Sequence, residues 1–260
     1  MHETERHRII LSEVNQRSMI SINELKNLLG SSEATVRRDI VRLDKSGMLR
    51  RIRGGAEPIT PPTVGSLLGK PYVFNESVNI DKKIAIGKLA SSMCQDGDSI
   101  IINGGTTTFQ MVSNLVQQNL NVLTNSWTIA DYLHLHTKHT VTLPGGTLYR
   151  DQNIILSPFH DGISSHFLAR LMFIGAQGIN SRGLLESDPL ILQAEQKLMS
   201  QAEKIIVMVD SSKFSVRNNL ILCSLDRIDT LITDSGIDEE SKQMLLDAGV
   251  KLMIADISTQ

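Results

Sequence analysis

The sequence predicts an α/β protein of two domains, a small helical domain followed by a larger domain with a largely parallel sheet. The chain has 260 residues and 41% apolar composition, which is enough to bury one small and one medium core. Proline is concentrated shortly after residue 57, and from about residue 81 short apolar segments alternate with helical ones. The predicted division is a first domain at residues 1–57, a linker at 58–75 and a second domain at 76–260.

The first domain is expected to begin with two helices. One runs from Glu5 to Val14, because its apolar residues recur at helical spacing. Ser21 and Glu24 form the pattern of a capping box, so the second helix starts there and ends at Gly30. The residues that this helix would bury are Leu25, Leu28 and Leu29.

The stretch from residue 31 to residue 56 predicts a third helix with a basic outer face. Ser32 stands where an N-cap belongs, and Gly47 marks the end of the helix. The apolar residues expected to face inward are Ala34, Val36, Ile40, Leu43 and Leu49. The outward face, which has the character of a helix that enters a DNA major groove, consists of Thr35, Arg37, Arg38 and Arg42.

A basic hairpin is predicted directly after this helix. Met48 to Ile52 should form a strand, and Gly54-Gly55 suits a tight turn. The hairpin carries Arg50, Arg51 and Arg53. Residues 31–56 hold seven basic and three acidic side chains, although the whole chain has a net charge of −2. The order of elements therefore predicts a winged helix-turn-helix that binds double-stranded DNA through Ser32, the outward residues of the helix and the three arginines of the hairpin. A merely solvated helix face is the alternative.

The remaining composition favours a cytoplasmic protein whose larger domain is not a second DNA surface. Four of the seven prolines lie between residues 58 and 71, as in a linker, and the net charge changes from +3 over residues 1–60 to −5 beyond. No apolar run is long enough to span a membrane, and the first ten residues lack the apolar stretch of a signal peptide. Cys94 and Cys223 have no metal-ligand spacing and are expected to be core residues.

The larger domain should contain seven sheet strands with helices between most of them. Two of the helices are Lys82–Cys94 and Asp238–Ala248. Several strand ends carry Gly, Thr, Asn or Asp, and ligands of open parallel sheets collect at the carboxyl ends of strands. The predicted strands are Ser99–Asn103, Val122–Thr124, Val141–Leu143, Leu171–Ile174, Lys204–Val209, Thr230–Thr233 and Val250–Ile254.

The first of these strand ends predicts an anion-binding loop. Two glycines allow close approach of the backbone, the next amides open a helix, and three hydroxyls can donate to oxygen. A phosphate group fits these donors, whereas the absence of a Walker A lysine and of GxGxxG disfavours a nucleotide. An ordinary strand-to-helix turn is the alternative. The residues of the loop are Asn103, Gly104, Gly105, Thr106, Thr107 and Thr108.

Other polar strand ends are expected to converge on the same cleft. Lys213 would supply positive charge, and Asp210 would accept hydrogen bonds from sugar hydroxyls, with an ordinary surface lysine as the alternative. The further strand-end residues are Thr124, Asn125, Gly145 and Gly146. His134, His136 and His139 lack the i, i+4 spacing of helical ligands, so neither a metal site nor any other cofactor is expected.

Segments spread over nearly the whole chain resemble the DeoR family of bacterial transcription regulators. The resemblance implies a repressor whose C-terminal domain is similar to the ribose-5-phosphate isomerase fold, with a phosphorylated sugar or sugar-derived metabolite as inducer. It assigns Gly104–Thr108 to the phosphate loop, Asp210 and Lys213 to the effector motif, and adds Glu195 and Lys197 to the expected effector-binding residues. The matching segments include ATVRRDIVRLDKSGMLRRIRGGA (34–56), KIAIGKLA (83–90), DGDSIIINGGTTT (96–108), LTNS (123–126), PGG (144–146), FIGAQGI (173–179), AEQK (194–197), VDSSKF (209–214) and LITDSG (231–236).

Departures from the common family pattern narrow the resemblance. Many members have Asp where this chain has Asn103, and Asp shortly before the strand that ends in FIG, where this chain has residues 169–172. At both positions this chain resembles the branch of the family that regulates L-ascorbate utilisation. The resemblance implies ascorbate phosphate, a pentose phosphate or a pentitol phosphate as effector and does not decide among them.

Two alternative functions are considered, a transcriptional activator and a sugar-phosphate isomerase, together with the oligomeric state. A transcriptional activator would use the same residues as a repressor. A sugar-phosphate isomerase would need a base beside the substrate carbon, and Asn103 removes one acid from the cleft, so no catalytic residue is expected. A single winged helix contacts few base pairs, so a homo-oligomer, a dimer or a tetramer, is expected on paired half-sites.

Overall fold

The computed structural model describes residues 3–16, 20–59, 72–76, 78–157 and 162–257. The chain divides into two compact units, Met1–Ser66 and Leu67–Gln260. Most of the predicted linker lies outside the described residues. Its last part, residues 72–75, forms most of helix α4 (Tyr72–Glu76), and the side chain of Tyr72 is buried.

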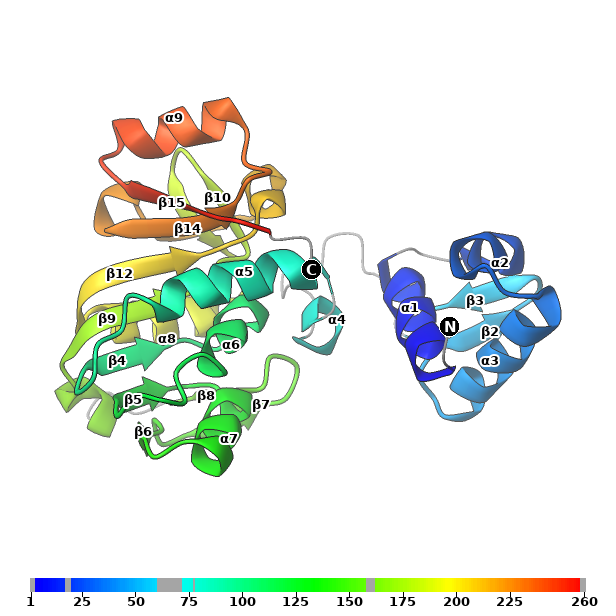
Figure 1. The fold of residues 1–260 in the computed structure, drawn as a ribbon, viewed down its shortest axis with the longest axis horizontal. Helices are drawn as coiled ribbons and strands as arrows, with labels where there is room; N and C mark the ends of the chain where they lie inside the picture. Colours follow the sequence, from blue (N-terminus) through cyan, green and yellow to red (C-terminus); the bar gives the residue numbers. More distant parts are fainter. Residues whose placement is uncertain (1–2, 17–19, 60–71, 77, 158–161, 258–260) are drawn as a thin grey trace. The chain divides into compact units, whose positions relative to one another are not determined.

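The N-terminal unit contains three helices and a small antiparallel sheet (Figure 1). The sheet has the strand order β1-β3-β2. Its core combines apolar residues of all three helices with Ile20, Leu49 and Ala56. The fold is therefore the predicted winged helix-turn-helix. Its elements are α1 (Glu3–Gln16), β1 (Ile20–Ser21), α2 (Ile22–Leu29), α3 (Glu33–Lys45), β2 (Arg50–Ile52) and β3 (Gly55–Glu57).

Local sequence signals account for the helix boundaries of this unit. Ser21 and Glu24 form both bonds of the capping box, and Gly30 ends α2 in the left-handed conformation with φ of 57°. Two residues predicted to be buried, Leu28 and Ala34, are exposed instead, because α2 and α3 each bury a face of fewer residues than the apolar pattern indicated.

The turn of the hairpin is shifted by one residue from the prediction. Its two-residue loop is Arg53-Gly54, and Gly54 has φ of 84°. Gly55 is instead the first residue of β3, where an added Cβ would lie 2.2 Å from the Ile20 carbonyl oxygen. Glycine is thus needed there because β1 packs directly against β3.

The larger unit is built on a seven-stranded parallel sheet with the order β15-β14-β12-β9-β4-β5-β6 (Figure 1). The seven predicted strands are these seven, with ends shifted by at most two residues. A hairpin, β7 with β8, and a three-stranded antiparallel sheet, β10-β11-β13, were not predicted. The sheet strands are β4 (Ser99–Ile102), β5 (Asn121–Thr124), β6 (Thr140–Thr142), β9 (Ala169–Ile174), β12 (Ala202–Met208), β14 (Thr230–Asp234) and β15 (Lys251–Ala255).

Each face of the parallel sheet has its own core. The central strands are buried on both faces, so Ile100 and Ile102 point to one core and Ile101 to the other. Helices α5, α6 and α7 cover the first face, whereas α8, α9 and the antiparallel sheet cover the second. The remaining elements are α5 (Ile80–Ser91), α6 (Thr106–Val112), α7 (Trp127–His136), β7 (Thr147–Tyr149), β8 (Ile154–Leu156), η1 (Ile163–His166), β10 (Gly178–Asn180), β11 (Gly183–Glu186), α8 (Pro189–Met199), η2 (Ser211–Ser215), β13 (Leu220–Cys223), η3 (Leu225–Arg227) and α9 (Glu239–Asp247).

The strand order reverses between β4 and β9. From β4 the chain proceeds to β5 and β6 on one side, and then returns to β9, β12, β14 and β15 on the other. The carboxyl ends of strands at such a reversal form the usual ligand crevice of an open α/β sheet. Within the described residues, no helix has the length and apolar character needed to cross a membrane.

Candidate functional site

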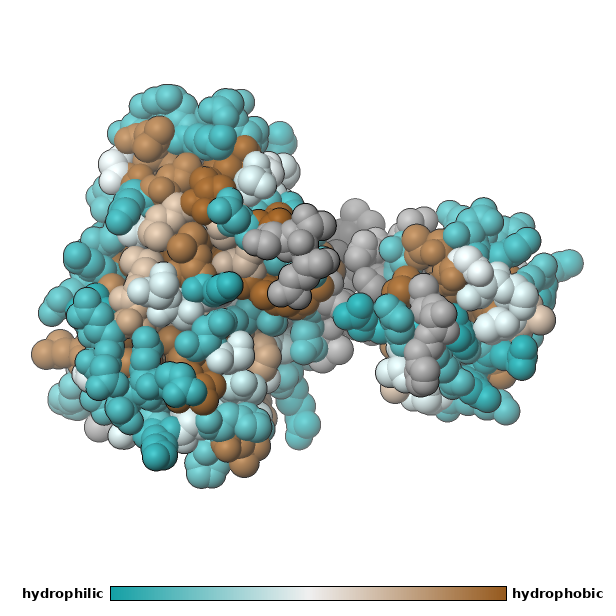
Figure 2. Space-filling model, in the orientation of Figure 1, coloured by the Kyte–Doolittle hydropathy of each residue, from teal (hydrophilic) through white to brown (hydrophobic). Residues whose placement is uncertain are grey.

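Helix α3 presents a basic outer face in the N-terminal unit. Its inner face buries Val36, Asp39, Ile40 and Leu43. The outward Arg37, Arg38 and Arg42 are exposed, as are the three arginines of the hairpin, Arg50, Arg51 and Arg53. Figure 2 shows a mostly hydrophilic surface over α3. The arginines predicted to contact DNA therefore lie in the same unit, and their side chains are exposed to solvent.

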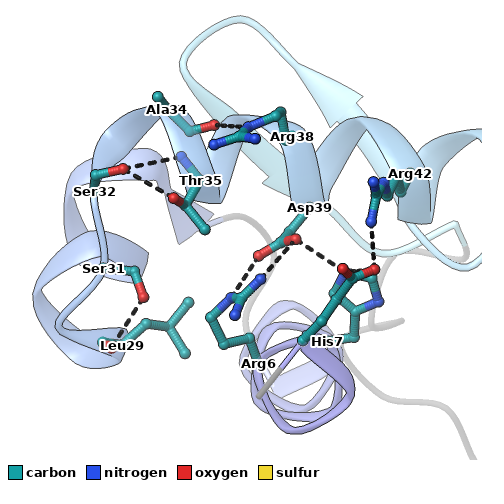
Figure 3. Close-up of polar contacts among 11 residues, drawn as sticks. Arg6, His7, Leu29, Ser31, Ser32, Ala34, Thr35, Arg38, Asp39 and Arg42 are labelled. Carbon is teal, nitrogen blue, oxygen red and sulfur yellow. Dashed lines mark hydrogen bonds and ion pairs between the residues drawn. The ribbon is translucent and has the colours of Figure 1, made fainter. Parts of the chain in front are cut away.

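Two of the predicted DNA-binding residues also form the N-cap of α3. The Ser32 hydroxyl accepts a hydrogen bond from the Thr35 amide at 3.2 Å and lies 2.9 Å from the Thr35 hydroxyl (Figure 3). Both side chains stand at the start of the helix, the end that enters a major groove in helix-turn-helix proteins. Their hydroxyls can exchange this local bond for one to DNA.

Several outward arginines are held by carboxylates. Arg37 contacts Glu33 at 2.6 Å, Arg50 pairs with Glu57, and Arg42 pairs with Glu3 from α1. Exposed ion pairs of this kind contribute little to stability, so an acceptor group on DNA can replace the carboxylate. In the part of the chain that the structure describes, the remaining arginines of this surface, Arg38, Arg51 and Arg53, form no ion pair.

Asp39, which the sequence did not single out, ties α3 to α1. Its carboxylate accepts from Arg6 Nε at 2.8 Å and lies 3.1 Å from His7 Nε2 (Figure 3). Burial by itself would raise the pKa of Asp39, but the hydrogen bonds from Arg6 and His7 lower the pKa overall. Helix α3 is thereby fixed to α1 by a charged contact on its inner side.

A groove runs between α3 and the hairpin. Arg37 lines it from the helix, and Arg51, Arg53 and Gly54 line it from the hairpin. Positive side chains on both walls suit the phosphate backbone of a duplex.

The larger unit has a cleft at the carboxyl ends of β4 and β9, where the strand order reverses. Residues 103–107 follow β4, and residues 175–177 follow β9. The other lining residues are Tyr72, Asn75, Lys83, Gln152, Glu186, Glu195 and Lys213. The cleft therefore gathers seven of the predicted effector-binding residues, namely Asn103, Gly104, Gly105, Thr106, Thr107, Glu195 and Lys213.

The loop after β4 is held in place by its own hydrogen bonds. The Gly104 amide donates to Asn125 Oδ1 at 2.8 Å, and the Thr108 hydroxyl donates to the Asn103 carbonyl at 2.7 Å. An added Cβ at Gly104 would lie 2.3 Å from Ile154 Cγ2. Asn125 and Thr108 thus shape the loop, which leaves Thr106 and Thr107 to meet a ligand.

Lys83 is the most important cleft residue that the sequence analysis missed. It is only 3% exposed, and its Nζ donates to the Asn75 carbonyl at 2.5 Å and to the Thr106 hydroxyl at 3.0 Å. Burial lowers the pKa of Lys83 to about 8; Asp210 opposes this shift and Lys213 adds to it. Both hydrogen-bond acceptors are uncharged, and an ammonium group has a third N–H, so an anion beside Thr106 would add a charged acceptor to the distant carboxylate of Asp210. Lys83 is the first residue of the segment 83–90 that resembles the DeoR family, and this resemblance was the sequence signal that could have identified it.

Two buried acids lie at another wall of the cleft. Asn103 Nδ2 donates to Glu195 Oε1 at 2.6 Å. Burial raises the pKa of Glu195 well above its usual value, and the neighbouring Glu186 raises it further. Burial also raises the pKa of Glu186, although hydrogen bonds from the Ser187 and Asp188 amides oppose the shift. These acids hold protons more readily than free carboxylates.

The other predicted effector-binding residues do not line the cleft. Thr124 accepts from the Ser126 amide within a turn, and Asp210 caps η2 and accepts from Asn79 Nδ2 at 3.0 Å. Gly145 and Gly146 precede β7, where Gly146 approaches the Leu156 carbonyl, and Lys197 is half-buried on α8. Asp210 and Asn125 support the cleft through neighbours that do contact it, Lys83 and Gly104. Among the residues described, no three His, Cys, Asp or Glu side chains are grouped to hold a metal ion.

The fold, the basic surface of α3 and the hairpin, and the cleft of the larger unit define a class of protein. It is a DNA-binding regulator of transcription that has a separate sensor domain. Residues 6–61 match the DeoR-like helix-turn-helix domain, and residues 78–235 match the DeoR C terminal sensor domain. The chain belongs to the DeoR family, and it is a regulator, not an enzyme.

Two relatives and two solved structures illustrate the similarity. The HTH-type transcriptional regulators UlaR of Escherichia coli O127:H6 and Shigella dysenteriae serotype 1 are 35% and 34% identical over 253 residues, which is 97% of this chain and 99% of each relative. Ribose 5-phosphate isomerase A from Methanocaldococcus jannaschii has a TM-score of 0.38 and 16% identity, over 52% of this chain and 55% of the isomerase. Translation initiation factor eIF-2B subunit delta from A. fulgidus has a TM-score of 0.39 and 9% identity, over 80% of this chain and 64% of the subunit. These two structural likenesses are weak and carry no part of the assignment.

Proposed function

We propose that this protein represses a carbohydrate-utilisation operon and is released from its operator by a phosphorylated sugar or sugar-derived metabolite. The observation that carries the effector assignment is Lys83, a buried amine whose two hydrogen-bond acceptors are neutral oxygens. It stands beside Thr106 in a cleft at the sheet reversal. A phosphate monoester would give Lys83 a charged hydrogen-bond acceptor, and Thr106 and Thr107 would donate to its oxygens.

On the DNA side, we assign the residues of α3 and the hairpin different roles. Thr35, Arg37 and Arg38, near the start of the recognition helix, contact base edges. The other residues of this surface, Ser32, Arg42, Arg50, Arg51 and Arg53, bind phosphates. The protein acts in the cytoplasm, where the operator is, as a homo-oligomer of at least two subunits, because paired subunits match paired half-sites.

The test is binding of the purified protein to the DNA upstream of its own gene, with and without a panel of sugar phosphates. Binding without ligand and release by at least one sugar phosphate is the expected result. Binding that requires the sugar phosphate would favour the activator alternative. Failure to bind that DNA under either condition would contradict the proposal.

Two arginine substitutions should separate base recognition from phosphate binding. Arg38→Ala is expected to reduce discrimination between operator and random-sequence DNA by about 1–3 kcal/mol, because a bidentate contact to guanine is lost. Arg53→Ala should weaken binding to both duplexes and reduce the salt slope by about 1, because a phosphate contact is lost. Fluorescence anisotropy over a range of salt concentrations measures both quantities.

Arg182→Ala is a matched control, because Arg182 is an exposed arginine of the larger unit. It should leave affinity and salt slope unchanged. If Arg38→Ala also left operator affinity unchanged, α3 would not be the recognition helix.

A further inference from the structure

Helix α4 adds residues to the cleft that neither family segment contains. The matched segments end at residue 61 and begin again at residue 78, so Tyr72–Glu76 lies between them. The Tyr72 amide donates to the Asp151 carbonyl at 2.8 Å, and the Asn75 carbonyl accepts from Lys83 Nζ. These bonds place Tyr72 and Asn75 in the wall of the cleft.

Two cleft residues have a buried polar atom without a hydrogen-bond partner among the described residues. They are the Tyr72 hydroxyl and Asn103 Oδ1, on side chains that are 6% and 1% exposed. The other end of the Asn103 amide is engaged, since Nδ2 donates to Glu195. Buried polar groups are nearly always satisfied in native proteins, so each of these two atoms needs a partner, and a ligand in the cleft can supply it.

The chemistry of the two atoms limits what can satisfy them. Asn103 Oδ1 is only an acceptor, so its partner must donate a hydrogen. Burial, reinforced by Glu76, raises the pKa of Tyr72, so the phenol keeps its proton and can both donate and accept. Alcohol groups of a ligand meet both requirements, and a second anionic group does not meet the first.

The cleft therefore has two chemically different parts. Lys83, Thr106 and Lys213 offer cations and donors, whereas Asn103 Oδ1 and the buried Glu186 and Glu195 offer acceptors. A ligand that fits both has one phosphate and a hydroxyl-bearing carbon chain or ring.

We propose that the Tyr72 hydroxyl and Asn103 Oδ1 bind hydroxyl groups of a polyhydroxy monophosphate, so that α4 forms part of the effector site. This assignment rests on the proposed function of the cleft and specifies the ligand further. It makes Tyr72 a specificity-determining residue that distinguishes a sugar phosphate from phosphate alone.

The experiment compares wild type with Tyr72→Phe by calorimetry, using inorganic phosphate and a panel of pentose and pentitol monophosphates. Wild type should bind at least one panel member more tightly than inorganic phosphate. Tyr72→Phe should weaken that binding by about 2- to 12-fold, the range for one lost neutral hydrogen bond, and leave the affinity for inorganic phosphate unchanged. The ligand-free melting temperature should stay the same or rise, because the variant removes a buried hydroxyl that lacks a partner.

Tyr149→Phe is the matched control. The Tyr149 hydroxyl donates to Asp188 Oδ2 at 3.0 Å, and Tyr149 does not line the cleft. This variant should lower the melting temperature and leave both phosphate affinities unchanged. A purely structural role for Tyr72 would give the same result as Tyr149→Phe.

The possible failures are distinguishable. If wild type binds neither inorganic phosphate nor any panel member, the proposed function of the cleft and this inference are both wrong. If wild type binds a panel member and Tyr72→Phe binds it equally well, only the assignment of Tyr72 is wrong.

Discussion

A Thr107→Glu protein is expected to bind operator DNA normally and to resist release by the effector. Thr107 lines the cleft and is 7% exposed, so a glutamate there adds both bulk and negative charge where the phosphate would bind. The helix-turn-helix lies in the other unit of the chain and keeps its sequence. The variant should therefore separate DNA binding from the response to ligand.

Calorimetry of effector binding, with and without operator, measures this separation. Allosteric coupling is reciprocal and typically changes affinity by about 5- to 150-fold, so wild type should bind effector more weakly when operator is present. Thr107→Glu should bind effector under neither condition. Thr107→Val, which removes the hydroxyl but adds no charge, should retain weakened binding. A Thr107→Glu protein that is released like wild type would place the effector outside this cleft.

A Lys83→Met protein is expected to lose roughly 10- to 150-fold in affinity for the effector, the range for a hydrogen bond to a charged group. The affinity of wild type should also fall as pH rises through about 8, because burial lowers the pKa of Lys83 to about 8. Above that pH the ligand-free protein holds Lys83 uncharged, and binding of an anion must then take up a proton. The methionine variant cannot titrate, so this part of the pH dependence should disappear.

The unfolding free energy gives an independent check on the same group. The pKa of Lys83 is lower in the folded state than its ordinary value of 10.5, so the unfolded chain binds more protons between the two values. Wild type should gain stability as pH rises from about 8 to 10.5, and Lys83→Met should lack that gain. Lys88→Met, at an exposed position of α5, is the control and should retain both pH effects. If the effector affinities of Lys83→Met and wild type depended on pH in the same way, Lys83 would not be the residue that binds the effector's anionic group.

The parallel sheet was predictable because its central strands are buried on both faces. Such strands are short runs of Ile, Val, Leu and Met, and segments such as Ser99–Ile102 and Ala202–Met208 stand out from their surroundings. The antiparallel sheet lacks this signal. Gly178–Asn180 has only three residues, with Ile179 its one large apolar side chain, and it pairs with β11, whose other partner β13 lies much later in the chain. Its strands are defined by tertiary pairing, which no local pattern records.

The candidate sites were predictable where one segment carries the chemistry. The recognition helix and the loop after β4 are continuous, so their residues could be named from spacing alone. Lys83 and Tyr72 could not, because each acts through burial beside residues from other elements. Tyr72 stood inside the predicted linker, where the proline-rich composition suggested no packed structure. Leu28 and Ala34 show the converse, since their apolar character indicated burial that the packing of α2 and α3 does not provide.

The contact between α1 and α3 has a consequence for how operator preference can evolve. Asp39 on the inner side of α3 forms an ion pair with Arg6 and contacts His7, both of α1, and the described structure pairs it with none of the arginines on the outer side. On the proposed assignment, anchoring and base recognition therefore depend on different side chains of one helix. We therefore expect substitutions at Thr35 or Arg38 to change the preferred DNA sequence and to leave the contact of Asp39 with α1 intact. Operator preference could then change through a few residues of the outer face, with the rest of the domain kept as it is.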